Sequence, residues 1–129
     1  MSDKHELLVR QFLDRLVERD YDAAAACVAT DARYHVSAWQ PAVVGRPAIR
    51  AEFDRQAALY SAFHYELVTV ASTDTVVFTE RLDNLTMGGR SVVLHWCGVF
   101  TFDTDGLISA IRDYYDIKEL EQALTAPPA

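Results

Sequence analysis

The spacing of apolar residues changes near position 63, and this change constrains the fold more than any other feature. Before it, apolar residues recur at helical spacing over residues 4–19, 21–29 and 47–60. A short strand, ARYHVSA, and a loop, WQPAVVGRP, separate the last two of these segments. After the change come four strand-like runs: FHYELVTVAS, TVVFTERLDNLT, RSVVLHWCGVFTF and LISAIRDYYDI. With a short final helix over 118–124, this order predicts an α+β fold.

The connections between the four runs predict how the strands pair. Each is short and rich in turn-forming residues: 72–74, 87–89 and 103–106. Connections this short make antiparallel hairpins, because parallel neighbours need a crossover of about a dozen residues or more. A mainly antiparallel sheet, strongly curved around the helices, would enclose a cavity. The chain is expected to form a single domain over 1–129, with a flexible tail at 125–129.

Composition and charge exclude several classes of function. Twelve Lys and Arg against nineteen Asp and Glu give a formal net charge of −7, and no basic run is present, so a nucleic-acid partner is not expected. No segment approaches the ~18 apolar residues of a membrane span, and the N-terminus MSDKHELLVR has no apolar leader, which predicts a cytoplasmic protein. The four histidines lack metal-ligand spacing, and we expect neither a metal nor a cofactor.

Charged residues interrupt two of the strand-like runs. Arg81 and Asp83 are two residues apart and therefore share one face of their strand. Asp113 falls in an otherwise apolar stripe, made by Leu107, Ile111 and Tyr115. A buried carboxylate is unfavourable unless it is paired or protonated. Two interpretations stay open: a solvated ion pair worth less than about 1 kcal/mol, or a buried acid–base site.

The second interpretation has a specific chemistry. If Arg81 lay between Asp83 and Asp113, the two carboxyls could not both ionise easily, and the pKa of one would rise. The guanidinium stays charged and can hold both through charge-assisted hydrogen bonds. One carboxyl would then accept a proton while the other donates one. That combination suits the opening of a strained ether, in which water loses a proton and the leaving oxygen gains one.

At these residues the sequence resembles the limonene-1,2-epoxide hydrolase family. The family's E-R-x-D motif is present at 80–83, its R-D-Y-F/Y-D motif at 112–116, GVF at 98–100, and its G-R helix start in GRPAIRAEF at 45–53. The similarity runs over about residues 5–124. The resemblance implies the nuclear-transport-factor-2-like cone, in which N-terminal helices pack on a curved mixed sheet around a deep pocket. It also implies a homodimer.

The resemblance assigns roles to four residues. Asp113 would be the general base that deprotonates water, Asp83 the general acid, and Arg81 the bridge between them. The implied reaction is the one-step, cofactor-free hydrolysis of a small hydrophobic epoxide, terpenoid or cyclic, to a vicinal diol. Tyr34 matches the family's Y-x-N motif, which positions the water, but Val36 stands where the Asn is expected. Ser37, His35 and His95 are the candidate replacements for that Asn.

Two further expectations concern apolar residues. Trp39, Phe78, Trp96 and Leu85 are interpreted as substrate contacts, with the alternative that the aromatic residues belong to the core. Tyr114 and Phe100 are interpreted as part of an outward sheet face, which would favour the homodimer.

Two other functions remain open on the sequence. One is a SnoaL-like polyketide cyclase or ketosteroid-isomerase-like enzyme, which uses the same cone and a carboxylate base. The other is a non-catalytic module that binds a small ligand, for which Val36 is the best argument.

Overall fold

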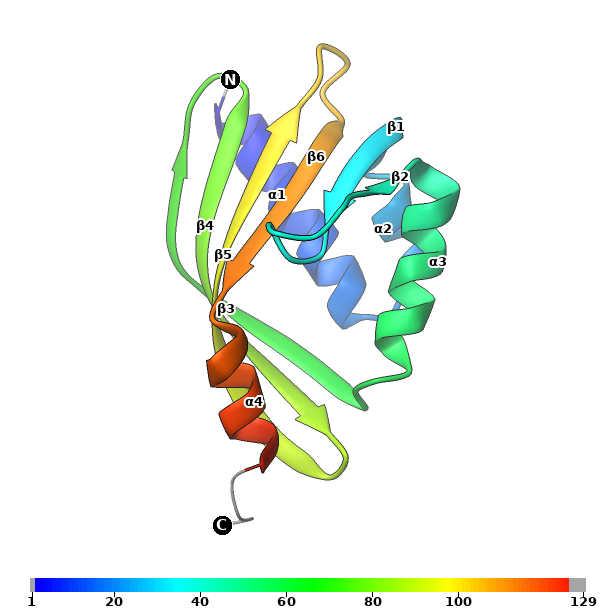
Figure 1. Ribbon diagram of the computed structural model, residues 1–129. Helices are drawn as coiled ribbons and strands as arrows, with labels where there is room; N and C mark the ends of the chain where they lie inside the picture. Colours follow the sequence, from blue (N-terminus) through cyan, green and yellow to red (C-terminus); the bar gives the residue numbers. More distant parts are fainter. Residues whose placement is uncertain (1, 126–129) are drawn as a thin grey trace.

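The computed structural model describes residues 2–125, so the predicted tail lies outside the described residues except for Thr125. Its helices are α1 (Ser2–Val17), α2 (Tyr21–Ala25), α3 (Arg46–Ala57) and α4 (Ile117–Thr125). Its strands are β1 (Val28–His35), β2 (Val43–Val44), β3 (Ala62–Ser72), β4 (Val76–Met87), β5 (Arg90–Phe102) and β6 (Ile108–Tyr115). The predicted α+β fold is confirmed (Figure 1). None of the helices within 2–125 is long and apolar enough to cross a membrane.

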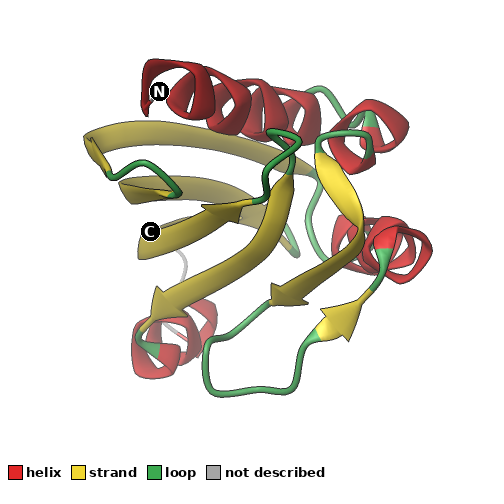
Figure 2. Ribbon diagram, turned by 90° about the horizontal axis from the view of Figure 1, so that it is seen from above, coloured by secondary structure: helices red, strands yellow, loops and turns green. Residues whose placement is uncertain are grey.

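The strands form one mixed sheet in the order β2-β1-β6-β5-β4-β3. The β3–β4, β4–β5 and β5–β6 pairs are antiparallel, as the short connections predict. β1 instead pairs with β6 in parallel. No short connection joins these two strands, so the turn residues did not predict this pairing. Seen from above, the sheet bends strongly without closing, and helices line the concave side (Figure 2). This is the predicted cone.

The hydrophobic core lies where α1 and α3 meet the concave face of the sheet. Phe12 of α1 is its centre: its ring centroid lies 5.9 Å from that of Phe53 on α3 and 6.1 Å from that of Phe100 on β5. Ile49 and Val77 are fully buried on either side of this cluster. Burial of side chains of this size contributes about 1.5–3 kcal/mol each, so the packing fixes the distance between the helices and the sheet.

Three expectations about the elements were wrong. The second helix was predicted over 21–29, but α2 ends at Ala25, because Val28 pairs with Ile108 of β6 and Cys27 O accepts a hydrogen bond from Ile108 N. The predicted loop before α3 contains strand β2, which pairs with the end of β1. Phe100 was expected to face outward, but it is 1% exposed, because it shares the inner face of β5 with Leu94.

Candidate active site

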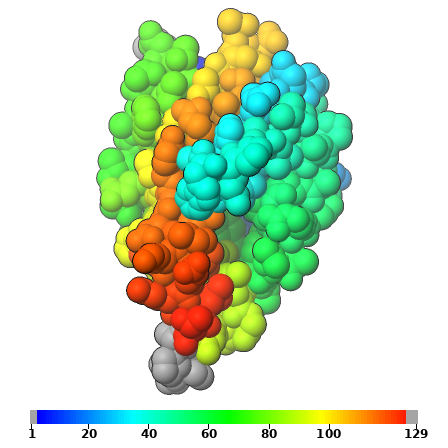
Figure 3. Space-filling model, viewed as in Figure 1, coloured from blue at the N-terminus to red at the C-terminus, as the bar shows by residue number. Residues whose placement is uncertain are grey.

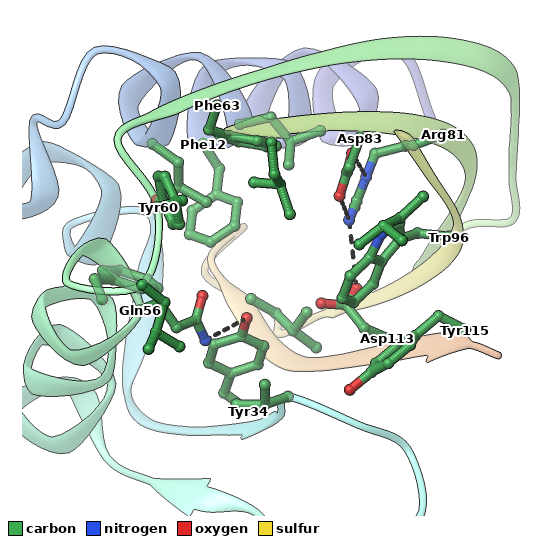
Figure 4. A pocket seen from close by; sticks show the side chains of 18 of the residues that line it. Phe12, Tyr34, Gln56, Tyr60, Phe63, Arg81, Asp83, Trp96, Asp113 and Tyr115 are labelled. Atoms are coloured by element: carbon green, nitrogen blue, oxygen red, sulfur yellow. Dashed lines mark hydrogen bonds and ion pairs between the residues drawn. The ribbon is translucent and has the colours of Figure 1, made fainter. Parts of the chain in front are cut away.

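The three charged residues singled out by strand alternation lie together inside the cone. Arg81 and Asp83 on β4 are each 5% exposed, and Asp113 on β6 is 7% exposed. Arg81 Nε donates to Asp83 Oδ1 and Arg81 Nη2 donates to Asp83 Oδ2, both at 3.2 Å. Arg81 Nη2 also lies 3.7 Å from Asp113 Oδ1 (Figure 4). The guanidinium therefore stands between two buried carboxyl groups.

Strand β5 lies between β4 and β6, so Arg81 reaches Asp113 across one intervening strand. Gly98 is the residue of β5 that pairs with both Thr79 of β4 and Asp113 of β6. It presents no side chain, and Arg81 Nη1 occupies the space beside it. This arrangement brings a cation on one strand to a carboxylate two strands away.

Burial dominates the electrostatics of these groups. It raises the pKa of Asp113 to about 6, against the attraction of Arg81 and with the repulsion of Asp83 added to it. Burial also raises the pKa of Asp83, less so because Arg81 donates two hydrogen bonds to it. Burial alone would lower the pKa of Arg81, but the two carboxylates outweigh that effect and keep the guanidinium charged. Below about pH 6 the carboxyl pair therefore holds at least one proton.

The charged groups open on a cavity of about 240 Å³ with mainly apolar walls. This is a small pocket for an organic ligand. Its walls come from α1, α3 and the inner faces of the strands, and include Phe12, Leu16, Phe53, Leu85, Leu94, Trp96 and Phe100. Arg55 of α3, Met87 at the end of β4 and Leu120 of α4 also line it, as does Leu59 just after α3. The surface is hollowed between α3 and α4 (Figure 3).

Tyr34 lies in the cavity beside a residue that the sequence analysis missed. Gln56 Nε2 on α3 donates to Tyr34 Oη at 3.4 Å and to Glu52 Oε2 at 2.9 Å. Burial raises the pKa of Tyr34, and the negative charge of Asp113 raises it further. The signal for Gln56 was its spacing: it follows Phe53 by three residues and therefore shares the buried face of α3.

The predicted substrate contacts divide into two groups. Trp96 and Leu85 line the cavity. Trp39 and Phe78 do not: Trp39 is 57% exposed in the loop after β1 and Phe78 is 42% exposed. Phe78 is an odd number of residues from Arg81, so it points to the opposite face of β4, away from the cavity.

None of the three side chains considered as replacements for the missing Asn lines the cavity. Ser37 Oγ is hydrogen-bonded to Tyr115 Oη at 2.5 Å. His35 Nδ1 contacts Gln40 O at 2.9 Å. His95 is largely exposed and its Nδ1 lies 2.8 Å from Glu119 Oε2 of α4. The apolar side chain of Val36 lines the cavity itself.

Fold and site together define a class of protein: an α+β cone whose interior holds a buried carboxyl–guanidinium–carboxyl set beside an apolar cavity. Within residues 2–125, no three His, Cys, Asp or Glu side chains cluster closely enough to hold a metal ion. The chain belongs to the SnoaL-like domain family, whose model matches residues 9–111.

Two similar proteins agree with the resemblance to epoxide hydrolases, and a third shares the fold alone. The chain is 30% identical over 116 residues to the epoxide hydrolase EphG of Mycobacterium tuberculosis (strain ATCC 25618 / H37Rv). The aligned region covers 90% of this chain and 76% of that protein. A solved M. tuberculosis LEH-like epoxide hydrolase superposes with a TM-score of 0.83 at 27% identity, covering 95% of this chain and 90% of that one. A putative SnoaL-like polyketide cyclase from Shewanella denitrificans OS-217 shares the fold, with a TM-score of 0.84 at 15% identity over 95% and 98% of the two chains.

Proposed function

We propose that the protein is a cofactor-independent epoxide hydrolase that adds water to a small hydrophobic epoxide and releases a vicinal diol. The observation that carries this proposal is the position of Arg81 between two buried carboxyls at the wall of an apolar cavity. An ion pair kept only for stability gains little from such burial, because desolvation offsets most of the attraction. The similarity to proteins named as epoxide hydrolases supports the same reading.

The proposed reaction occurs in one step. Asp113 takes a proton from water while the water oxygen forms a bond to one ring carbon. The bond between that carbon and the epoxide oxygen breaks, and the oxygen receives a proton from Asp83. Turnover leaves Asp113 protonated and Asp83 ionised, so one proton must return to Asp83 before the next cycle. Arg81 stabilises whichever carboxyl is ionised at each stage.

The base is assigned to Asp113 because Tyr34 lies on its side of the cavity. Tyr34 on β1 pairs with Ile111, which precedes Asp113 by two residues on the same face of β6. Asp113 is the more easily protonated carboxyl, because burial raises its pKa to about 6 and Arg81 makes only the 3.7 Å contact with it. A water bound to Asp113 restores part of its lost hydration and favours its ionised form, which leaves the shared proton to Asp83.

The cavity walls indicate the substrate class. They are formed mainly by aliphatic and aromatic side chains. The charged residues of the lining are Arg81, Asp83 and Asp113, together with Arg55, which is paired with Glu52. An apolar epoxide, terpenoid or cyclic, would bury its hydrocarbon part against these walls and present its ring oxygen to the carboxyls. An anionic substrate would bring a further negative charge next to two carboxyls and is disfavoured.

A homodimer is part of the proposal. The outer face of the sheet exposes five apolar side chains, with Glu80 and His95 among them. We call these five the outer patch: Phe78, Leu82, Val93, Cys97 and Tyr114. Cys97 pairs with Tyr114 across β5 and β6, which places it near the middle of this patch. An exposed patch of this kind suits a two-fold interface between copies of the chain.

The test is turnover of cyclic terpene and styrene-type epoxides in ¹⁸O-labelled water. The proposal predicts a diol with one labelled oxygen, and loss of its formation in Asp113→Asn and in Asp83→Asn. Full activity in either variant would refute the assigned role of that residue. A ring-closed product without label would identify a cyclase instead, and ligand binding with no turnover would identify a binding module.

A further inference from the structure

The amide of Gln56 has a fixed orientation, because its neighbour can only accept hydrogen bonds. Burial tends to raise the pKa of Glu52, but hydrogen bonds from Arg55 and from Gln56 outweigh it and lower that pKa. Glu52 is therefore an ionised carboxylate, which has no proton to donate. The Gln56 group that contacts Glu52 Oε2 at 2.9 Å must be the NH₂ group. The carbonyl oxygen of Gln56 is then turned the other way, into the cavity (Figure 4).

The same amide determines what Tyr34 can do. Gln56 Nε2 donates to Tyr34 Oη, so the phenol oxygen serves as the acceptor in that contact. The hydroxyl proton of Tyr34 is left for another partner. Burial raises the pKa of this phenol, so the proton stays on it throughout the neutral range. Tyr34 thus offers a donor, and Gln56 an acceptor, to a molecule bound in the cavity.

A nucleophilic water needs both groups. One of its hydrogens points to Asp113, and the second needs another acceptor if the attacking lone pair is to have a fixed direction. The side chain of Val36 contributes only carbon to the cavity wall, and Ser37, His35 and His95 make their contacts elsewhere. The hydroxyls of Tyr21, Tyr60 and Tyr115 also line the cavity, but Gln56 is the one side-chain amide among the described lining residues, and it is the group in contact with Tyr34.

We infer that Gln56 is a positioning residue that accepts the second hydrogen of the nucleophilic water, while Tyr34 donates to the oxygen of that water. This inference rests on the proposed function. It means that helix α3 supplies the group that the resembling family takes from the strand before it. Val36 replaces the Asn expected after β1, and the amide that holds the water comes from Gln56 on α3.

Gln56→Met tests the inference. Met has similar length and high helix propensity but no amide acceptor, so the variant should fold. We expect kcat to fall by about 10- to 100-fold, because a misdirected water reacts poorly. KM should change by less than about twofold, because the lost group contacts the water and not the epoxide. Gln56→Leu should behave in the same way. Gln11→Met, the same change at an exposed position of α1, should leave both constants unchanged.

Rescue separates positioning from packing. Val36→Asn combined with Gln56→Met returns an amide to the cavity wall and should recover most of the lost kcat. Wild-type kcat in Gln56→Met and Gln56→Leu would overturn the inference. A rise of KM that accompanies the fall of kcat, without rescue in the double variant, would also overturn it. That result is expected if Gln56 only forms part of the cavity wall. If the double variant does not fold, the separate effects on kcat and KM in the single variants decide the matter.

The same experiments separate this inference from the proposed function. If the wild-type protein forms no diol from any epoxide, the proposed function fails and the role of Gln56 fails with it. If the wild-type protein forms diol and Gln56→Met does so equally well, only the inference fails.

Discussion

Gly98 on β5 lies directly against the guanidinium of Arg81: a methyl group placed on Gly98 would be 2.8 Å from Arg81 Nη1. The same methyl group would be 3.0 Å from Thr79 Oγ1 and 3.0 Å from Phe100 Cε1. Gly98 also pairs with Asp113. The missing side chain therefore gives Arg81 the space to cross β5 and reach the second carboxyl.

Gly98→Ala should reduce hydrolysis by at least about tenfold, because the guanidinium must move away from one or both carboxyls. Overpacking at this position should also destabilise the fold by about 1–3 kcal/mol. Steady-state kinetics together with urea unfolding measure the two effects. Ser91→Ala, at an exposed position of the same strand, is the control and should change neither. A Gly98→Ala variant with wild-type activity would show that the site does not depend on this approach.

The pH dependence of kcat/KM should be bell-shaped, with its maximum in the mildly acidic range. The reaction needs one proton on the carboxyl pair. Below the lower pKa of the pair both groups are protonated and no base is present. Above the higher one both are ionised and no acid is present. Burial raises the pKa of Asp113 to about 6, and this is the higher pKa of the pair. Activity should therefore fall as the pH rises above about 6. A rate that only increases from pH 5 to pH 9 would contradict the shared proton.

The placement of Arg81, Asp83 and Asp113 on inner faces was predictable because β4 and β6 are regular enough for side chains to alternate. Alternation also places Phe78 on the other face of β4, so its interpretation as a substrate contact was inconsistent with the alternation that placed Arg81. The parallel pairing of β1 with β6 was not predictable from turns, since it joins segments some 80 residues apart. Gln56 was missed for a related reason: its role depends on how closely α3 approaches β1, which spacing along a single helix does not specify.

Asp113→Asn should stabilise the protein at neutral and alkaline pH. In the folded state the pKa of Asp113 is raised from its ordinary value of 3.8 to about 6, so its contribution to stability is present at low pH and lost as the pH rises through about 6. A shift of this size corresponds to on the order of 2–3 kcal/mol. Asn resembles the protonated carboxyl and does not ionise, so the variant does not lose this stability as the pH rises.

Thermal unfolding at pH 8 and pH 4 measures this effect. The melting temperature of Asp113→Asn should exceed that of the wild type by several degrees at pH 8, and the difference should shrink at pH 4. Asp31→Asn, at an exposed position of β1, is the control and should show no such difference. A variant less stable than the wild type at pH 8 would mean that the attraction of Arg81 for ionised Asp113 exceeds the effect of burial.

Phe78→Lys should separate the proposed dimer into single chains without loss of hydrolysis. Phe78 belongs to the outer patch and points away from the cavity, so the substitution leaves the site intact. A two-fold interface contains the changed residue twice, and burial of each Phe contributes about 1.5–3 kcal/mol, so the dissociation constant should rise at least about 100-fold. The new residue is basic in a chain of net charge −7, so the effect cannot come from added repulsion between acidic chains.

Light scattering at micromolar concentration measures the mass. Leu7→Lys, the same kind of change at an exposed position of α1, should leave the dimer intact. A wild-type protein with the mass of one chain, or a Phe78→Lys variant that dimerises as tightly as the wild type, would exclude the outer patch as the interface.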